Sequence, residues 1–207
     1  MDALKSIAAM FEPDPRQLNW WIRNEDDGTV RPMMLDDHHV NISQVTLSDS
    51  VPEDVRQHME TAKNLALFSW YVYRFIPVAE LQAYNAFEWA LRIRYAIADD
   101  EKPSFSKLLR RAIDERLLTR ADLATGLSVS PFEIVTGNAF LDANLSTGLE
   151  DEQFMEAFHR GIIGLRNLLA HGSFNLLPDG TMTLKVVALA INALFRAHHT
   201  PSLPEIP

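Results

Sequence analysis

The chain has 207 residues, of which 47% are hydrophobic and 23% charged, enough for one well-buried domain plus an extension but too few for two full domains. Its net charge of −9 argues against nucleic-acid binding by bulk electrostatics, so any RNA binding requires a local basic patch. Cysteine is absent, which excludes disulfides, thiolate metal ligands and a cysteine nucleophile. With no signal peptide and no apolar run near the ~20 residues of a membrane span, we predict a cytoplasmic protein without membrane association.

The first fifty residues differ in character from the remainder and are predicted to form an N-terminal extension of open role. Short helices are expected over residues 2–11 and 16–23. Residues 28–47 carry β-formers interrupted by Pro32 and by Asp36-Asp37, which predicts a loop with one or two short strands.

From Ser50 onward the apolar spacing becomes helical. The predicted helices cover residues 53–75, 79–98, 104–118, 150–171 and 184–199. A loop-rich segment, 119–149, begins with a capping box formed by Thr119 and Asp122. The fold class is therefore all-α: an up-and-down bundle of four to five helices over residues 51–199, followed by a proline-rich tail, 200–207.

Several residues with chemical potential meet at the end of the helix predicted for 150–171. One stripe of it carries, at spacing i, i+4, i+7 and i+11, Arg160, Gly164, Asn167 and His171. Arg166 lies beside that stripe, about 140° around the helix axis from His171. Gly172 is expected to end the helix in a left-handed conformation.

This combination suits phosphate chemistry. His171, among free helix carbonyls, could act as a general acid or base at neutral pH. Arg166 could stabilise charge on a phosphoryl oxygen, and Asn167 could donate a hydrogen bond to it. The competing interpretation makes Arg166 a solvated surface residue and His171 a helix cap, and the spacing alone favours it because a similar pair recurs from Arg31 to His38, in a segment not expected to be helical.

Two features of the context favour a site. Gly161 and Gly164 lie inside a helix, where each costs about 1 kcal/mol relative to alanine unless it permits close approach by a helix, a subunit or a ligand. Glu88 interrupts an apolar stripe formed by Tyr84, Phe87, Leu91 and Tyr95. It could pair with Arg92 one turn later or reach Arg166 across the bundle and orient it.

Taken together, these residues resemble the HEPN superfamily (higher eukaryotes and prokaryotes nucleotide-binding domains). The resemblance spans about residues 60–198, and three segments carry it: Arg166-Asn167-x-x-x-His171-Gly172, 86–92 (AFEWALR) and 104–109 (SFSKLL). It implies a helical bundle that dimerises so that two motif helices face each other. It also implies a metal-independent endoribonuclease of a toxin–antitoxin or antiviral system, with Arg166 and His171 catalytic and Asn167 supporting. One branch of the family has a nucleotidyl-accepting tyrosine two residues after the histidine, and here that position is Ser173.

We therefore predict RNA cleavage by attack of the 2′-hydroxyl on its own phosphate, with no metal and no cofactor. Glu88 and Arg160 would support the catalytic residues, and a homodimer would supply the second proton-transfer group. RNA would approach along the basic run that includes Lys107, Arg110 and Arg111, although such a run is more often a solvated helix face. An antitoxin protein is an expected partner. Two alternatives remain: a non-catalytic module that binds nucleotide, RNA or a protein through the same groove, and a helical dimer without a ligand.

Other candidate sites are weaker. Asp36-Asp37-His38-His39 has metal-ligand chemistry, but a polar loop is the favoured interpretation because adjacent extended residues point apart. The four tryptophans are expected to pack rather than stack on bases, and His58 and His159 to be surface or satisfied core residues. The eight glycines are scattered, which argues against a phosphate-cradling loop and nucleotide-triphosphate hydrolysis.

Overall fold

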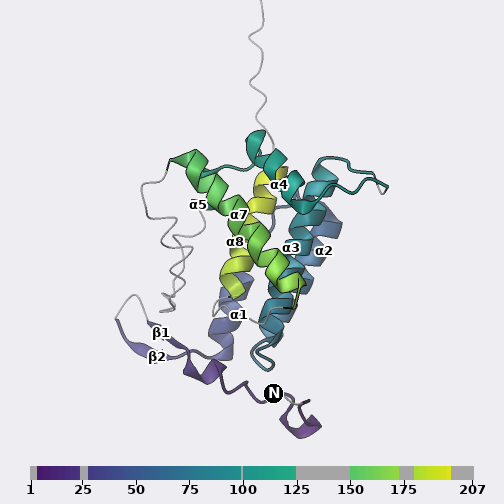
Figure 1. The fold of residues 1–207 in the computed structure, drawn as a ribbon. Helices are drawn as coiled ribbons and strands as arrows, with labels where there is room; N and C mark the ends of the chain where they lie inside the picture. Colours follow the sequence, from purple (N-terminus) through teal and green to yellow (C-terminus); the bar gives the residue numbers. More distant parts are fainter. Residues whose placement is uncertain (1–3, 24–27, 99, 125–149, 173–179, 197–207) are drawn as a thin grey trace, which may run out of the picture.

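A computed structural model describes residues 4–23, 28–98, 100–124, 150–172 and 180–196 (Figure 1). This part of the chain is mostly helical, with seven α-helices and a small N-terminal hairpin, and the all-α prediction is confirmed. The helices are α1 (Leu35–Ser43), α2 (Glu53–Phe68), α3 (Phe75–Arg94), α4 (Phe105–Asp114), α5 (Arg120–Ala124), α7 (Asp151–Ala170) and α8 (Gly180–Phe195). The antiparallel hairpin pairs β1 (Trp21–Arg23) with β2 (Val30–Pro32). No described helix is both long and apolar enough to cross a membrane.

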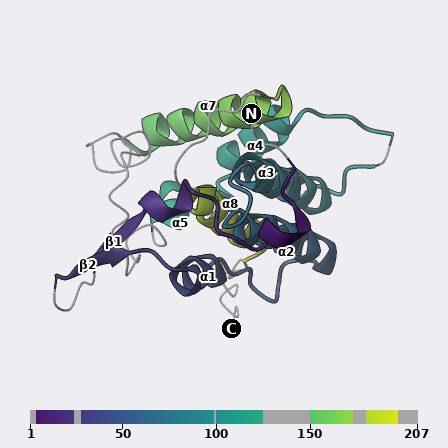
Figure 2. The ribbon, with the colours of Figure 1, turned by 90° about the horizontal axis from the view of Figure 1, so that it is seen from below.

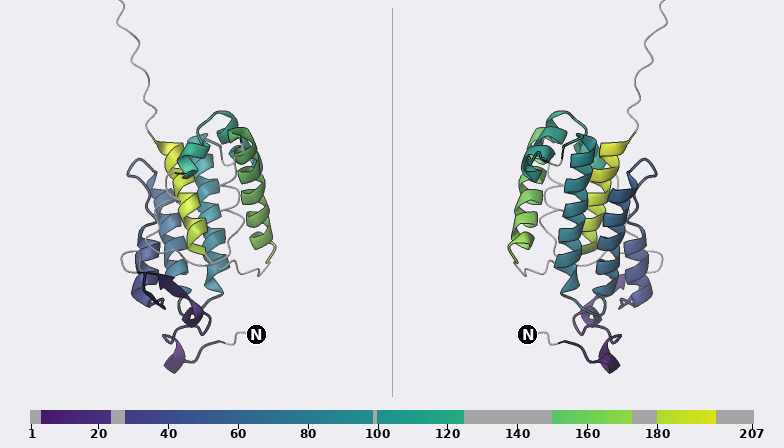
Figure 3. Two further views of the ribbon diagram at one scale, coloured as in Figure 1. Left: turned by 90° about the vertical axis from the view of Figure 1, so that its left-hand side faces the viewer. Right: turned by 90° about the vertical axis from the view of Figure 1, so that its right-hand side faces the viewer.

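Helix α3 is the centre of the bundle and packs against α2, α4, α7 and α8. Seen from below, α8 lies in the middle, with α7 on one side and α1 on the opposite side (Figure 2). The side views show α7 along the outer edge of the bundle (Figure 3). Among the described helices, this placement leaves one face of α7 uncovered.

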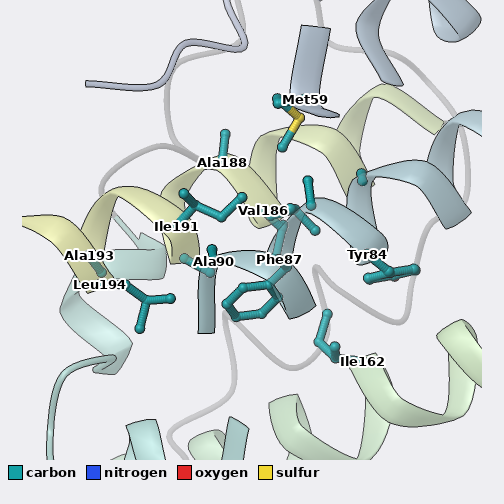
Figure 4. Close-up of a cluster of buried hydrophobic side chains, with 14 of the residues drawn as sticks. Met59, Tyr84, Phe87, Ala90, Ile162, Val186, Ala188, Ile191, Ala193 and Leu194 are labelled. Atoms are coloured by element: carbon teal, nitrogen blue, oxygen red, sulfur yellow. The ribbon is translucent and has the colours of Figure 1, made fainter. Parts of the chain in front are cut away.

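The core forms where the apolar stripes of these helices meet (Figure 4). Phe87 of α3 lies among side chains of α8, with Met59 of α2 and Ile162 of α7 nearby. The expected spacing of Tyr84, Phe87 and Leu91 indeed places all three inside. Helix α8 is apolar around most of its circumference, which is why it occupies the interior.

Helix boundaries differ from the prediction around Pro77. The second helix was expected to begin at residue 79, but α3 begins at Phe75 and contains Pro77 in its first turn. Proline is tolerated there because the first backbone N–H groups of a helix have no intrahelical partner. Helix α2 correspondingly ends at Phe68 instead of residue 75, and α8 begins at Gly180, before the expected residue 184.

The N-terminal region requires two corrections. Residues 16–23 were expected to be helical, but a short 3-10 turn (Gln17–Asn19) is followed by strand β1. The expected loop over 28–47 contains strand β2 and helix α1. Asp37, which was taken as a breaker, accepts a hydrogen bond from the backbone N–H of Met34 at 2.8 Å and starts the helix.

The extension contributes to the folded core. Ile42 and Val45 are buried in the same apolar cluster as the bundle helices. Asp14 donates its backbone N–H to the carbonyl of Trp70 at 2.9 Å, and Gln17 Nε2 donates to the carbonyl of Ser69 at 3.1 Å. The core therefore extends across the predicted domain boundary at residue 50.

The segment predicted as a loop-rich middle is described only at its beginning. There the expected capping box is present: the Thr119 N–H and hydroxyl both donate to Asp122 Oδ2, at 2.8 and 2.7 Å, and α5 follows. Residues 125–149, the tail 200–207 and Ser173 lie outside the described residues.

Candidate functional site

Helix α7 ends where the sequence predicts. It is regular to Ala170, and the backbone N–H of the next residue, His171, donates to the carbonyl of Asn167 at 3.0 Å. Gly172 has a φ of 77°, the left-handed conformation that glycine adopts without a side-chain penalty. The imidazole of His171 is thus attached at the carbonyl end of a complete helix.

Arg166 forms an ion pair with Glu88, which is one of the two pairings predicted for this carboxylate. Arg166 Nη2 donates to Glu88 Oε2 at 3.1 Å, across the contact between α7 and α3. The side chains are 31% and 25% exposed, so the ion pair is shielded more than a surface pair but is not fully buried. Arg92, the alternative partner, donates instead to the backbone carbonyls of Ala98 and Glu101.

One donor of Arg166 remains unsatisfied. Its Nε is buried and has no hydrogen-bond partner among the described residues. Leaving a buried donor unpaired costs about 1–3 kcal/mol, so native proteins rarely do so without a reason. The Glu88 carboxylate orients the Arg166 guanidinium but does not accept a hydrogen bond from every one of its N–H groups.

The carboxylate buried on the α3 stripe is Glu80, not Glu88. Glu80 is 2% exposed and accepts a hydrogen bond from the Thr183 hydroxyl of α8 at 2.7 Å. The predicted apolar stripe begins at Tyr84. Glu80 lies four residues earlier, so it occupies the same face of α3 one turn before that stripe. Burial, with Glu80 nearby, raises the pKa of the Tyr84 phenol.

Asn167 and His171 face solvent. Neither side chain has a partner in the part of the chain that the structure describes, and neighbouring Leu168 is 41% exposed. A Cβ added at Gly164 would meet nothing within 4 Å, so no described element uses the close approach that this glycine permits. Arg166 therefore points toward α3 while His171 points outward, and one chain does not bring the two together.

The remaining predicted site residues are mostly engaged in ion pairs. Arg160 lies 3.7 Å from Glu156, on the exposed stripe. Arg110 approaches the same carboxylate at 2.6 Å. Arg111 pairs with Glu115 at 2.8 Å, and its guanidinium stacks 4.0 Å from the ring centre of Tyr95. Lys107 has no side-chain partner among the described residues.

His159 is satisfied, as expected for a histidine of no catalytic role. Its Nδ1 lies 3.2 Å from Arg110 Nη2, which can only donate, so Nδ1 is the acceptor. Nε2 then carries the hydrogen and donates to the carbonyl of Ser106 at 3.0 Å. This tautomer cannot take a proton from the nearby Ser106 hydroxyl at Nε2, which excludes a serine–histidine nucleophile pair.

Three cavities lined by described residues lie away from the motif. The largest, of about 790 Å³, is between the end of α4 and the first half of α7. A neighbouring cavity of about 430 Å³ runs along α4, and a third, of about 340 Å³, lies between α2 and Trp89. Arg166, Asn167 and His171 line none of these three.

The segment Asp36-Asp37-His38-His39 is helical, so the polar-loop interpretation is wrong. Asp37 pairs with Arg31 at 2.6 Å. His38 is buried, with Nε2 at 2.9 Å from the carbonyl of Ala66, and burial lowers the pKa of its imidazole. Within the described ranges, no group of three or more histidine, aspartate or glutamate side chains is arranged to hold a metal ion.

The tryptophans divide by environment. Trp70 is buried and its ring lies 5.7 Å from the ring of His38, as expected for a packing residue. Trp21 and Trp89 are exposed, so the packing prediction does not hold for them.

No protein-family model matches this sequence, and no curated protein or solved structure is similar enough to count as a match.

Proposed function

We propose that this chain is a metal-independent endoribonuclease of the HEPN type, acting as a homodimer in a toxin–antitoxin or defence setting. The observation that carries the proposal is the ion pair between Glu88 and Arg166, 3.1 Å apart, beside an exposed histidine at the end of the same helix. The pair fixes the Arg166 guanidinium from a second helix, α3.

Arg166 serves as the charge clamp. Glu88 takes one terminal nitrogen and fixes the direction of the guanidinium, which leaves the other terminal nitrogen able to donate to a phosphoryl oxygen. A donor fixed before the reaction stabilises the charge of a pentavalent phosphorus without having to reorganise. Glu88 is then a positioning residue, because it acts through Arg166.

His171 moves the protons, with Asn167 as a neighbouring donor. The RNA 2′-oxygen attacks the adjacent phosphorus while its proton passes to a general base. The bond from phosphorus to the 5′-oxygen breaks, and that oxygen takes a proton from a general acid. The products are a 2′,3′-cyclic phosphate and a 5′-hydroxyl, so the protein supplies no nucleophile.

A dimer supplies what one chain lacks. Each motif has one histidine, whereas the reaction needs an acid and a base at the same time. The exposed stripe of α7, with Gly164 and Leu168 at its middle, offers a surface on which a second α7 could pack closely. Such packing would also bring His171 of one protomer toward the Arg166 of its partner.

The test is cleavage in the presence of excess chelator. Purified protein is incubated with single-stranded RNA and EDTA, and the product ends are identified by mass spectrometry. We expect cyclic phosphate ends from the wild type and loss of at least a hundredfold in rate for His171→Ala and for Arg166→Ala. His39→Ala, which removes an exposed histidine of α1, is the matched control and should cleave normally. Cleavage that requires a divalent metal, or full activity of His171→Ala, contradicts the proposal.

The second candidate is a non-catalytic module that binds nucleotide, RNA or a protein through the same α7 face. The net charge of −9 favours it. RNA binding by wild type without any cyclic phosphate product would support this module over the enzyme.

A further inference from the structure

The cavity of about 790 Å³ is rich in arginine, and an equal number of carboxylates lines it. Its basic side chains are Arg110, Arg116, Arg120 and Arg160, and the adjoining cavity along α4 adds Lys107 and Arg111. The whole chain has 19 lysines and arginines and a net charge of −9, so these six are about a third of its basic residues. Five carboxylates line the same two cavities, so this surface is slightly positive on an otherwise acidic protein.

Arg116 occupies an unfavourable backbone conformation. Helix α4 ends in a Schellman motif: the N–H of Arg116 donates to the carbonyl of Ile113, and that of Leu117 to Ala112, both at 2.9 Å. The motif requires a left-handed residue, usually glycine, and Arg116 has a φ of 56°. Gly172 occupies the corresponding position after α7 and Ala96 the one after α3, so a left-handed residue other than glycine occurs twice among the described residues.

The Arg116 side chain is also available for binding. Its guanidinium has no hydrogen bond, ion pair or ring contact with any described residue. By contrast, Arg110 is held by Glu156 at 2.6 Å and Arg120 lies 3.4 Å from Asp151. The carboxylates Glu156 and Asp151 position these two arginines, whereas Arg116 has no partner among the described residues, like the carboxylates Asp114 and Glu152 of the same cavity. A guanidinium that lines a cavity and has no described partner can donate to an anionic ligand.

We propose that this cavity binds the phosphodiester backbone of single-stranded RNA, with Arg116 donating to a phosphate. The inference rests on the proposed function, which makes RNA the substrate. Arginine presents paired N–H donors that match phosphate oxygens. Along α7, Arg160 and His171 are separated by about 16 Å, so one strand of a few nucleotides can contact the cavity and the motif together. The cavity would bind nucleotides that flank the cleaved bond.

Substituting Arg116 by glycine separates the role in binding from a role in folding. Arg116→Gly relieves the left-handed strain, so its Tm should rise by about 2–4 °C while its RNA binding falls. Ala96, with a φ of 48°, occupies the same position of an identical motif at the end of α3, where its N–H donates to Ile93. Ala96→Gly is therefore the matched control, with the same gain in Tm and unchanged RNA binding. Arg116→Lys keeps the charge and should keep most of the binding.

Binding is measured by fluorescence anisotropy with a labelled 20-nucleotide single-stranded RNA, in the His171→Ala background to prevent cleavage. For Arg116→Gly we expect about fivefold weaker binding at low salt, and a slope of log K against log salt that is smaller by about 0.7, the value for one lost phosphate contact. An unchanged affinity and slope would overturn the inference and leave the proposed function standing.

The other outcomes separate the two proposals. If RNA binds through Arg116 but the wild type cleaves none, the proposed enzyme fails and the binding site stands. If RNA does not bind at all, both fail. If poly-glutamate displaces the RNA at equal charge concentration, the cavity is a site for acidic peptides and the RNA assignment is wrong.

Discussion

Arg166 is oriented by the carboxylate of Glu88, 78 residues earlier in the chain. The pair joins α3 to α7 and leaves Arg166 Nε without a described partner. Such a partly exposed pair contributes only about 0–1 kcal/mol to folding. In the proposed mechanism, the role of this ion pair is to fix the position of the Arg166 guanidinium.

The first prediction concerns this orientation. Glu88→Ala should lower kcat for RNA cleavage by about a hundredfold with little change in KM, because a misplaced clamp affects the transition state more than binding. Glu88→Gln, which keeps an acceptor oxygen, should recover part of the loss. Glu60→Ala, which removes a carboxylate of an exposed pair on α2, is the control. Equal losses in kcat for Glu88→Ala and Glu88→Gln would contradict a positioning role.

The second prediction concerns His38. Because burial lowers the pKa of its imidazole in the folded state, the unfolded chain binds a proton more readily as pH falls below about 6.5. Stability should therefore be full at pH 7 and decrease toward pH 5, with a slope of at most about 1.4 kcal/mol per pH unit from this one group.

Urea unfolding at the two pH values measures the effect. His38→Gln keeps a donor for the carbonyl of Ala66 but cannot titrate, so its stability should change less between pH 7 and 5. His39→Gln, the exposed neighbour, should behave like the wild type. An identical pH dependence in His38→Gln and wild type would rule His38 out as the source.

At the scale of elements, helix ends were predicted well where their signals are local. The capping box of Thr119 and Asp122 and the left-handed Gly172 both appear as expected. Helix α1 was missed because Asp36-Asp37 were interpreted as strand breakers, although acidic residues equally suit the first turn of a helix. The left-handed conformation of Arg116 was not predicted, because a left-handed arginine has no signature in sequence.

The third prediction concerns α5. Asp122 caps this helix and also forms an ion pair with Arg196, after the end of α8. Asp122→Ala removes the cap and leaves Arg196 without this partner, so we expect a loss of about 2 kcal/mol in the free energy of unfolding.

Chemical denaturation of two variants tests it. Asp122→Asn keeps an oxygen for the Thr119 N–H but loses the charge, and should lose about half as much. Asp114→Asn, an acidic residue at the end of α4 without a described partner, should be neutral. A change below about 0.5 kcal/mol in Asp122→Ala would mean that α5 is held by packing alone.

At the scale of the molecule, the extension and the bundle share one apolar core. Ile42 and Val45 lie in it, and α1 packs against α2. A boundary at residue 50 would therefore expose apolar surface rather than divide two independent units.

The fourth prediction follows from this shared core. Removing residues 1–47 deletes Ile42 and Val45 from the core cluster, each worth about 1.5–3 kcal/mol, a large share of the 5–15 kcal/mol that holds a domain together. That truncation should unfold the chain or lower its Tm by more than 10 °C in circular dichroism. Removing only 1–33 leaves α1 in place and should cost much less. A stable chain after removal of 1–47 would establish the bundle as an independent domain.

The sequence by itself determined the helical class, the bundle and the end of α7, because periodicity and capping act between residues a few positions apart. It also named Glu88 as a partner of Arg166, although only as one of two choices. The tertiary structure decided that choice, placed Glu80 rather than Glu88 in the core and joined α1 to the bundle. It also directed Arg166 and His171 to different sides of α7. These outcomes depend on which helices meet, and contacts between segments distant in the chain leave no local pattern from which to predict them.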